Sequence, residues 1–366
     1  MQQVRSAVSA FYHPDPEHVA YNRRGFWVAA IVELIGLLIF VGLFNLAFDR
    51  VGAGLDGLPL IILGLLMSVV PAALWLLFFY RMDRLEPEPK EKLFGVFLLG
   101  ALVAAALTEP ILEGFFAIDE WLYTSLATQL VGGILLVGFL QEGTVYLVVR
   151  YGIYGNPEFD ERVDGVIYAV CAGLGLATVL NFNYVLEHGG VDLGIGSVRM
   201  VVTALAHASF AGVLGYFLGQ ARFEKTPPLY LPAGLALAAV LNGVFFLLEE
   251  RVTDAGLTVN PWNGLLLATV VAVVTLAAVF WLVERANEET LRVAAQQRRQ
   301  QMAPERASVA TSAPPREAAE TAPGEAETAT ALEAAAEEPP EESSSSQGED
   351  TAETPADQDP EQKGGA

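Results

Sequence analysis

Eight hydrophobic runs, each long enough to cross a lipid bilayer, follow one another along this chain. A helix needs about 20 apolar residues to cross ~30 Å of hydrocarbon, and a backbone in lipid must satisfy its own hydrogen bonds. Because 53% of the 366 residues are hydrophobic, the chain is too apolar for a soluble protein of this size. We therefore predict an all-α polytopic membrane helix bundle. The runs are 25–48, 58–80, 93–116, 127–149, 164–185, 199–220, 229–248 and 263–283.

The basic residues fall almost entirely on one side of the predicted bundle. Of the 21 lysines and arginines, all but Arg50, Arg199 and Arg251 lie in the two termini or in the loops after the second, fourth and sixth runs. By the positive-inside rule that side is cytoplasmic. We therefore predict about eight transmembrane helices, both termini in the cytoplasm, and a multi-pass protein of the plasma membrane. The first run is too long for a signal peptide, so we expect it to be a retained helix.

Three regions follow from these patterns: a cytoplasmic N-terminal arm (1–24), a membrane domain (25–283) and an acidic tail (284–366). The tail is a tract of Ala, Glu, Pro and Ser, a composition typical of disorder. Its first stretch, 284–300, is compatible with a cytoplasmic extension of the last helix, with arginines against anionic lipid. The tail is either a docking arm or a solvated tether.

Ionisable residues within the hydrophobic runs are the candidates for chemistry, because charge is costly in lipid and such residues usually face the bundle interior. His207 lies in an otherwise apolar run, and Glu109 and Glu113 share a helix face because they are four residues apart. At ~1.5 Å per residue, we place Glu109, His207 and Asn242 about 9–12 Å from the outer surface. The same arithmetic places Glu142 about 20 Å deep. These depths allow a site in the outer half of the membrane.

Some of these residues also have purely structural interpretations. Glu113 can extend to the membrane surface while Glu109 accompanies a kink at Pro110. Asp164 can begin the fifth helix as its N-cap, or act as a gate at the mouth of a site. Cys171 is the single cysteine, so it can form neither an intrachain disulfide nor a cysteine-based metal site.

A set of motifs spans roughly residues 78–250, about half of the chain. It consists of RMDRLEPEPKEKLFGVFLLGAL, GFLQEGTVYLVV, NPEFDERVDGVIYAVCAGLGLATVLNFNY, RMVVTALAHASFAGVLGYFLGQARF and AVLNGVFFLL. In order and spacing these segments resemble the PrsW family of polytopic intramembrane proteases. The resemblance implies carboxylate and imidazole groups, with or without a divalent metal such as zinc, that activate water and cut a membrane helix. The resemblance also implies that the typical substrate is an anti-sigma factor.

Carried over residue by residue, the resemblance selects Glu142, Asn181 and His207, with Asp164 at the mouth. It implies that Glu142 is a general base or metal ligand and that His207 is a ligand or acid. Asn181 and Asn242 would support them by hydrogen bonds.

The chain departs from the family pattern at four positions. A zinc site normally takes three protein ligands, and Glu142 and His207 supply two. Glu109 and Glu113 are candidates to complete a Glu/Glu/His site. The departures are Gln141 at the first Glu, Val145 at the Lys, Leu180 at the Glu before Asn181, and Asn242 at the final His.

Three functions are compatible with these observations. The first is a membrane-embedded protease acting on membrane-protein substrates, and the second is an inactive pseudoprotease that binds membrane helices as a scaffold. The third is a small-molecule transporter, although the two halves show no inverted repeat. The expected partners are the lipid bilayer and a substrate or partner helix, and no nucleic acid.

Overall fold

A computed structural model of the chain describes residues 23–48, 55–82, 88–188, 193–255, 269–270, 273–274, 276–293 and 295–296. Every regular element in these ranges is helical, as predicted. Residues 1–22 of the predicted N-terminal arm and the tail beyond 296 lie outside the described residues. The elements are α2 (Arg23–Phe48), α3 (Gly57–Met82), α4 (Lys90–Val103), η1 (Ala104–Thr108), η2 (Pro110–Phe115), α5 (Ile118–Trp121), η3 (Leu122–Thr124), α6 (Leu126–Gly132), η4 (Gly133–Gly138), α7 (Phe139–Gly152), α8 (Arg162–Glu187), α9 (Leu193–Phe223), α10 (Tyr230–Ala255) and the helical segment 276–293.

Six helical stretches among the described residues are long and apolar enough to cross a membrane, so this is a multi-pass membrane protein. They correspond to the second to seventh predicted spans. The first predicted span lies in α2, where a shorter apolar stretch runs over Ile31–Phe44, and the eighth falls largely outside the described residues. The count of eight and the cytoplasmic termini therefore stay predictions. The six stretches are Gly57–Arg81, Lys90–Thr124, Leu126–Gly152, Arg162–Glu187, Gly196–Phe223 and Tyr230–Leu248.

The helices α8 and α9 form the centre of the bundle. In each of them 89% of the most apolar window is buried, against 28% for Lys90–Thr124. The two helices pack through small residues, which let membrane helices approach closely. A methyl group on Gly173 of α8 would lie 2.6 Å from Ala211 Cβ and 2.8 Å from the carbonyl oxygen of His207, both on α9. The backbone that carries His207 is therefore fixed by direct contact with α8.

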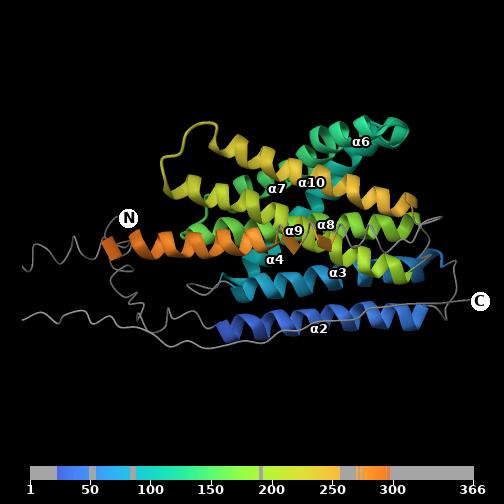
Figure 1. Ribbon diagram of the computed structural model, residues 1–366, viewed down its shortest axis with the longest axis horizontal. Coiled ribbons are helices and arrows are strands. Elements are labelled where there is room, and N and C mark those ends of the chain that lie inside the picture. The colour runs from blue at the N-terminus through green and yellow to red at the C-terminus, as the bar shows by residue number, and fades with distance from the viewer. Residues whose placement is uncertain are drawn as a thin grey trace, which may run out of the picture. The chain divides into compact units, whose positions relative to one another are not determined.

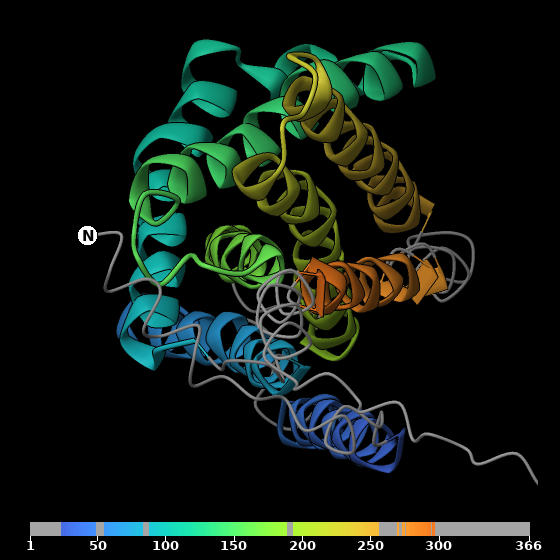
Figure 2. The ribbon, with the colours of Figure 1, turned by 90° about the vertical axis from the view of Figure 1, so that its left-hand side faces the viewer.

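The remaining helices surround this central pair (Figure 1). The helices α3, α4 and α7 pack on α8, and Figure 2 shows α8 nearly end-on among them. On the other side, α10 packs against η4, α9 and α7. The outer faces of the peripheral helices expose large apolar side chains, among them Leu38, Leu58, Phe94 and Leu102, which is the surface that lipid requires.

The start of α8 is organised by a capping box. Glu161 is the N-cap residue, and Asp164 Oδ2 accepts a hydrogen bond from the Glu161 backbone N–H at 2.6 Å. The prediction that Asp164 itself is the N-cap is therefore wrong, because Asp164 occupies the third helical position and its carboxylate reaches back to the cap. One turn later the Tyr168 hydroxyl donates to Glu88 Oε2.

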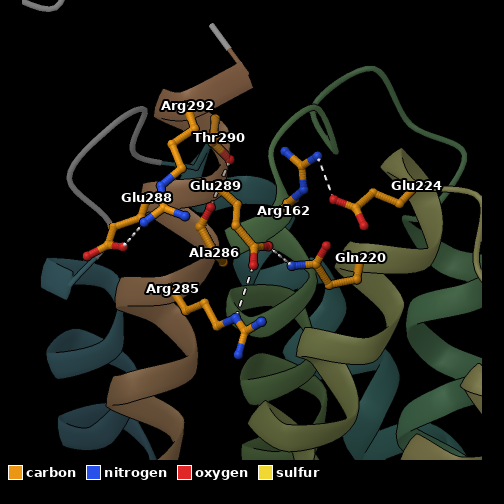
Figure 3. Close-up of polar contacts among 9 residues, drawn as sticks. All are labelled: Arg162, Gln220, Glu224, Arg285, Ala286, Glu288, Glu289, Thr290 and Arg292. Carbon is orange, nitrogen blue, oxygen red and sulfur yellow. Dashed lines mark hydrogen bonds and ion pairs between the residues drawn. The ribbon is translucent and has the colours of Figure 1, made fainter. Parts of the chain in front are cut away.

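The helical segment 276–293 docks on α9 through a polar cluster (Figure 3). Glu289 accepts hydrogen bonds from Gln220 of α9 and, at 3.0 Å, from Nε of Arg285. Partial burial opposes ionisation of Glu289, yet these two hydrogen bonds lower its pKa below the usual value. The predicted extension of the last helix beyond residue 284 is thus present up to residue 293.

Candidate functional site

A cavity of about 370 Å³ lies at one end of the bundle, where α8 ends and α9 begins. Its walls come from eight helical elements, η2, α5, η3, η4, α7, α8, α9 and α10, with further side chains from Glu109, between η1 and η2, and from His188, directly after α8. The residues that line it are Glu109, Leu112, Glu113, Ile118, Asp119, Tyr123, Val137, Gln141, Leu180, Asn183, Tyr184, Glu187, His188, Arg199, Thr203, His207, Asn242, Phe245 and Phe246.

The structure places Glu109, Glu113 and His207 on this one cavity. His207 is 4% exposed, and its ring lies edge-on to Phe210 with centroids 6.1 Å apart. Glu109 is half-buried, and its Oε1 has no hydrogen-bond partner within the described part of the chain. Glu113 is exposed at the mouth. The cavity therefore brings together the exposed carboxylate of Glu113, the half-buried carboxylate of Glu109 and the buried imidazole of His207.

Interruptions of α-helical geometry position these carboxylates. Two π-helical segments, η1 and η2, flank Glu109, and Pro110 begins the second, so the kink expected at Pro110 is a π-helical turn. Such turns are rare and often occur at functional sites. The hydroxyl groups of Thr108 and Thr144 hydrogen bond to each other. That contact fixes the segment carrying Glu109 against α7.

Glu142 lies behind the cavity wall and is not among its lining residues. Glu142 is 1% exposed, and its Oε1 accepts a hydrogen bond from Nδ2 of Asn242 at 2.9 Å. Asn242 does line the cavity, so the interaction of Glu142 with the cavity runs through this amide. Oε2 of Glu142 is buried without a hydrogen-bond partner in the described ranges.

Two other candidates lie away from the cavity. Asn181 is fully buried, and its Nδ2 donates to the carbonyl oxygen of Met200 at 3.0 Å, so it joins α8 to α9. Asp164 lies in the first turn of α8, whereas Glu187, near the other end of the same helix, lines the cavity. The length of α8 separates Asp164 from the site.

Several lining residues were missed by the sequence reasoning. Arg199, Thr203 and His207 recur every four residues on α9, and Asn183 and Glu187 do so on α8. Residues four apart share a helix face, so the spacing from His207 was the signal that could have found Arg199 and Thr203. The Arg199 guanidinium lies 3.9 Å from the centroid of the Tyr184 ring.

The comparison with known families decides the classification. The model of the PrsW family of intramembrane metalloproteases matches residues 88–283, which is more than half of the chain and includes every residue of the cavity. The chain belongs to the PrsW family. This confirms the resemblance seen in the motifs and makes the chain a member of a family of membrane proteases.

Three relatives named Protease PrsW match about half of the chain or more. Protease PrsW of Geobacillus kaustophilus is 32% identical over 189 residues, which cover 50% of this chain and 80% of the relative. Protease PrsW of Bacillus subtilis is 28% identical over 186 residues (49% and 78%). Protease PrsW of Oceanobacillus iheyensis is 29% identical over 229 residues (61% and 96%). No solved structure matches the chain significantly.

The positions at which the chain departs from the PrsW pattern meet at the cavity. Gln141, Leu180 and Asn242 all line it, at the places where the resemblance implies Glu, Glu and His. Val145 is the exception, because it is buried in the hydrophobic core. Three of the four departures from the pattern that the resemblance implies therefore line one cavity, and all three carry uncharged side chains.

The family description implies a metal, and the residues present do not fit one. Across the described ranges no three His, Cys, Asp or Glu side chains gather closely enough to hold an ion. The predicted ligands Glu142 and His207 are divided, because His207 lines the cavity and Glu142 lies behind Asn242. Amide side chains such as Gln141 and Asn242 are weak ligands for zinc, which prefers imidazole, thiolate or carboxylate.

Proposed function

We propose that this chain hydrolyses a peptide bond of a membrane-protein substrate within the cavity described above. The observation that carries the proposal is that Glu109, Glu113 and His207 line one cavity of about 370 Å³ in a member of a protease family. A carboxylate and an imidazole that line one cavity can serve as the general base and the hydrogen-bond donor that peptide hydrolysis by water requires.

In this proposal Glu109 is the general base. Its unpartnered Oε1 accepts a proton from water, the water oxygen bonds to the scissile carbonyl carbon, and the C–N bond then breaks as that proton passes to the leaving amine. His207 donates a hydrogen bond to the oxygen that becomes negative. The Gln141 amide and the second N–H of Asn242 Nδ2 act in the same way, as donors aimed at developing charge. No step is routed through a metal.

Glu142 is a positioning residue in this scheme. Its hydrogen bond at 2.9 Å holds the amide of Asn242 in one orientation. This revises the role that the PrsW resemblance implies for Glu142, because a general base must reach the attacking water directly or through one other water.

We place the cavity on the extracytoplasmic side of the plasma membrane. The support is the distribution of basic residues, because the loops around residues 113–126 and 188–199 lie opposite the basic side of the bundle. An anti-sigma factor with a single membrane helix is the proposed substrate type. Reporter fusions at residues 24 and 296 should both give a cytoplasmic signal, and an extracytoplasmic signal at either position would reverse the orientation.

Mutation of the two direct participants tests the chemistry. A doubly tagged single-span membrane protein, co-expressed with wild type, should yield a shortened fragment on a denaturing gel. Glu109→Gln and His207→Ala should each lower the cleavage rate by ~10²-fold or more, a typical contribution of a positioned acid or base. Glu142→Gln should cost less than Glu109→Gln, because the glutamine can still bond to Asn242.

The matched control is Glu120→Gln, because Glu120 is exposed next to Asp119 on α5 and lies outside the cavity lining. This variant should cleave at the wild-type rate. If Glu109→Gln cleaves as fast as Glu120→Gln while Glu142→Gln is inactive, the base is Glu142 and the proposed arrangement is wrong.

A pseudoprotease is the second candidate function, and one observation favours it. Gln141, Leu180 and Asn242 are uncharged at the cavity positions where the resemblance implies Glu, Glu and His. In that case wild type, Glu109→Gln and His207→Ala would all capture the same membrane helix by crosslinking, and none would cut it.

A further inference from the structure

Three separate elements bring acidic side chains to the mouth of the cavity. Glu113 comes from η2, Asp119 from α5 and Glu187 from the end of α8, and all three are exposed. Glu109 lies deeper on the same wall, one helical turn before Glu113. Of the described residues that line the cavity, four are therefore acidic, and the only lysine or arginine among them is Arg199.

Arg199 supplies one positive charge against the four carboxyl groups of the cavity lining. Its guanidinium carbon lies 3.9 Å from the centroid of the Tyr184 ring. The exposed carboxylates of Glu113 and Asp119 are on η2 and α5. The mouth thus keeps a net negative charge, and such charge in a cleft raises the local concentration of cations.

A second, independent feature of the cavity indicates that it receives a ligand. His207 is 4% exposed and Gln141 is 6% exposed, and both line the cavity. Neither side chain hydrogen bonds to another described residue, and Oε1 of Glu109, which lines the same cavity, is buried without a partner among the described residues. Because buried polar groups are nearly always hydrogen bonded, these three groups on one cavity indicate that their partners come from a molecule that enters it.

We propose that the mouth selects substrates that carry a lysine or arginine on the extracytoplasmic side of the scissile bond. This inference rests on the proposed function, because it takes Glu109 and His207 as the point of cleavage. The acidic rim then binds the cationic side chain while the polar floor binds the peptide group to be cut. The rim is defined as Glu113, Asp119 and Glu187.

The geometry limits where the cation lies in the substrate. Glu113 is four residues beyond Glu109, which is at most about 6 Å along the axis of a helix. An extended substrate rises about 3.3 Å per residue, so the cation belongs about two to four residues from the scissile bond once the length of its side chain is included. A cation further away would lie outside the rim.

The rim should act on substrate binding, and its effect should depend on salt. Exposed ion pairs are weak individually, each worth a factor of about 1.4 to 5 in affinity, so three carboxylates together should change KM about fivefold or more. Since charges separated by more than ~8 Å are screened at physiological ionic strength, the effect should shrink at high salt.

The experiment compares one substrate series with three enzymes. The substrates are synthetic single-span helices that differ at one position, three residues outside the cleavage point, which carries Lys, Gln or Glu. The enzymes, in detergent micelles, are wild type, the triple variant Glu113→Gln/Asp119→Asn/Glu187→Gln, and the control Glu120→Gln. For wild type and the control, KM should rise from Lys to Gln to Glu, by about fivefold or more for the first step.

For the triple variant the ratio of KM between the Lys and Gln substrates should fall close to one. The wild-type ratio should also fall when NaCl is raised from 0.05 to about 0.5 M. A wild-type enzyme that cleaves the Lys, Gln and Glu substrates with equal KM overturns the inference, and this result does not depend on the folding of any variant.

Photocrosslinking of the same helices separates this inference from the proposed function. If wild type crosslinks the Lys helix in preference to the Gln helix but cuts neither, the proposed hydrolase is wrong and the rim still selects cations. If wild type cuts both helices and crosslinks them equally, the hydrolase stands and the charge selection is wrong.

Discussion

Replacing Gly243 by alanine should push α10 away from η4 and disturb the floor of the cavity. A methyl group at this position would lie 2.5 Å from the Cα and 2.6 Å from the N of Ile134, and 2.7 Å from the carbonyl carbon of Gly133. All three are backbone atoms, so none can rotate away. Non-bonded carbon atoms pack at about 3.5–4.0 Å, and the two helices must therefore separate by about 1 Å.

The neighbouring residue converts this separation into a functional loss. Asn242 donates to Glu142 at 2.9 Å, and a shift of about 1 Å takes that distance beyond hydrogen-bonding range. Overpacking costs about 1–3 kcal/mol, and the buried carboxyl left without its donor costs about 1–3 kcal/mol more. Misplacing a substrate-facing group by about 1 Å can lower a rate about 10²-fold. We therefore expect Gly243→Ala to be both less stable and nearly inactive.

The matched control is Gly143→Ala, because a methyl group on Gly143 would meet nothing within 4 Å. Both variants add one methyl to a glycine close to the Glu142–Asn242 pair, and they differ in the space available. Thermal unfolding in detergent, followed by tryptophan fluorescence, should show a lower Tm for Gly243→Ala and a wild-type Tm for Gly143→Ala. Equal Tm values and equal cleavage rates for the two variants would refute the reasoning.

Three further outcomes follow from contacts outside the cavity. Cys171 is fully buried, so a maleimide should label the protein only as it unfolds, and rapid labelling of native protein would contradict its burial. Arg222 donates to several backbone carbonyl oxygens, including that of Phe159 at 2.8 Å, and lysine lacks the planar guanidinium that reaches them together. Arg222→Lys should therefore lower the free energy of unfolding by about 1–3 kcal/mol and speed proteolysis of the loop 153–161. An unchanged rate of proteolysis would disprove this prediction. The pKa of Glu289 is lowered in the folded protein. The ionised carboxylate therefore stabilises the contact of segment 276–293 with α9 at any pH above the usual carboxyl pKa, and this stabilisation is lost as the pH falls through the pKa of Glu289 in the folded protein. Hydrogen exchange in segment 276–293 should therefore rise in acid, and Glu289→Gln should abolish that pH dependence.

The membrane spans could be predicted from the sequence because a bilayer imposes a fixed length of apolar residues. The second to seventh runs all appear as described helices, with bounds within a few residues of those expected except at the end of the third, which continues to Thr124. The grouping of Glu109, His207 and Asn242 was also predictable, since their estimated depths were similar and all three line one cavity. Both predictions needed only the position of each residue along the membrane normal.

The place of Glu142 required coordinates that the sequence does not supply. The depth estimate separated Glu142 from Asn242 by about 10 Å, yet their side chains hydrogen bond at 2.9 Å, so that estimate was wrong. Membrane helices tilt by about 20° on average, and the π-helical η4 (Gly133–Gly138) changes both rise and rotation just before Glu142. A helix that is apolar on most faces gives no periodic signal that would reveal these changes.

The contact of Gly173 with Ala211 and with the His207 carbonyl oxygen links the packing of α8 on α9 to the position of a cavity residue. One additional methyl group on Gly173 would displace the backbone of His207, although Gly173 does not line the cavity. Gln141, by contrast, lines the cavity from α7, so its replacement changes the wall directly. A substitution can therefore alter the site in two ways, by moving the backbone that carries His207 or by replacing a side chain of the wall.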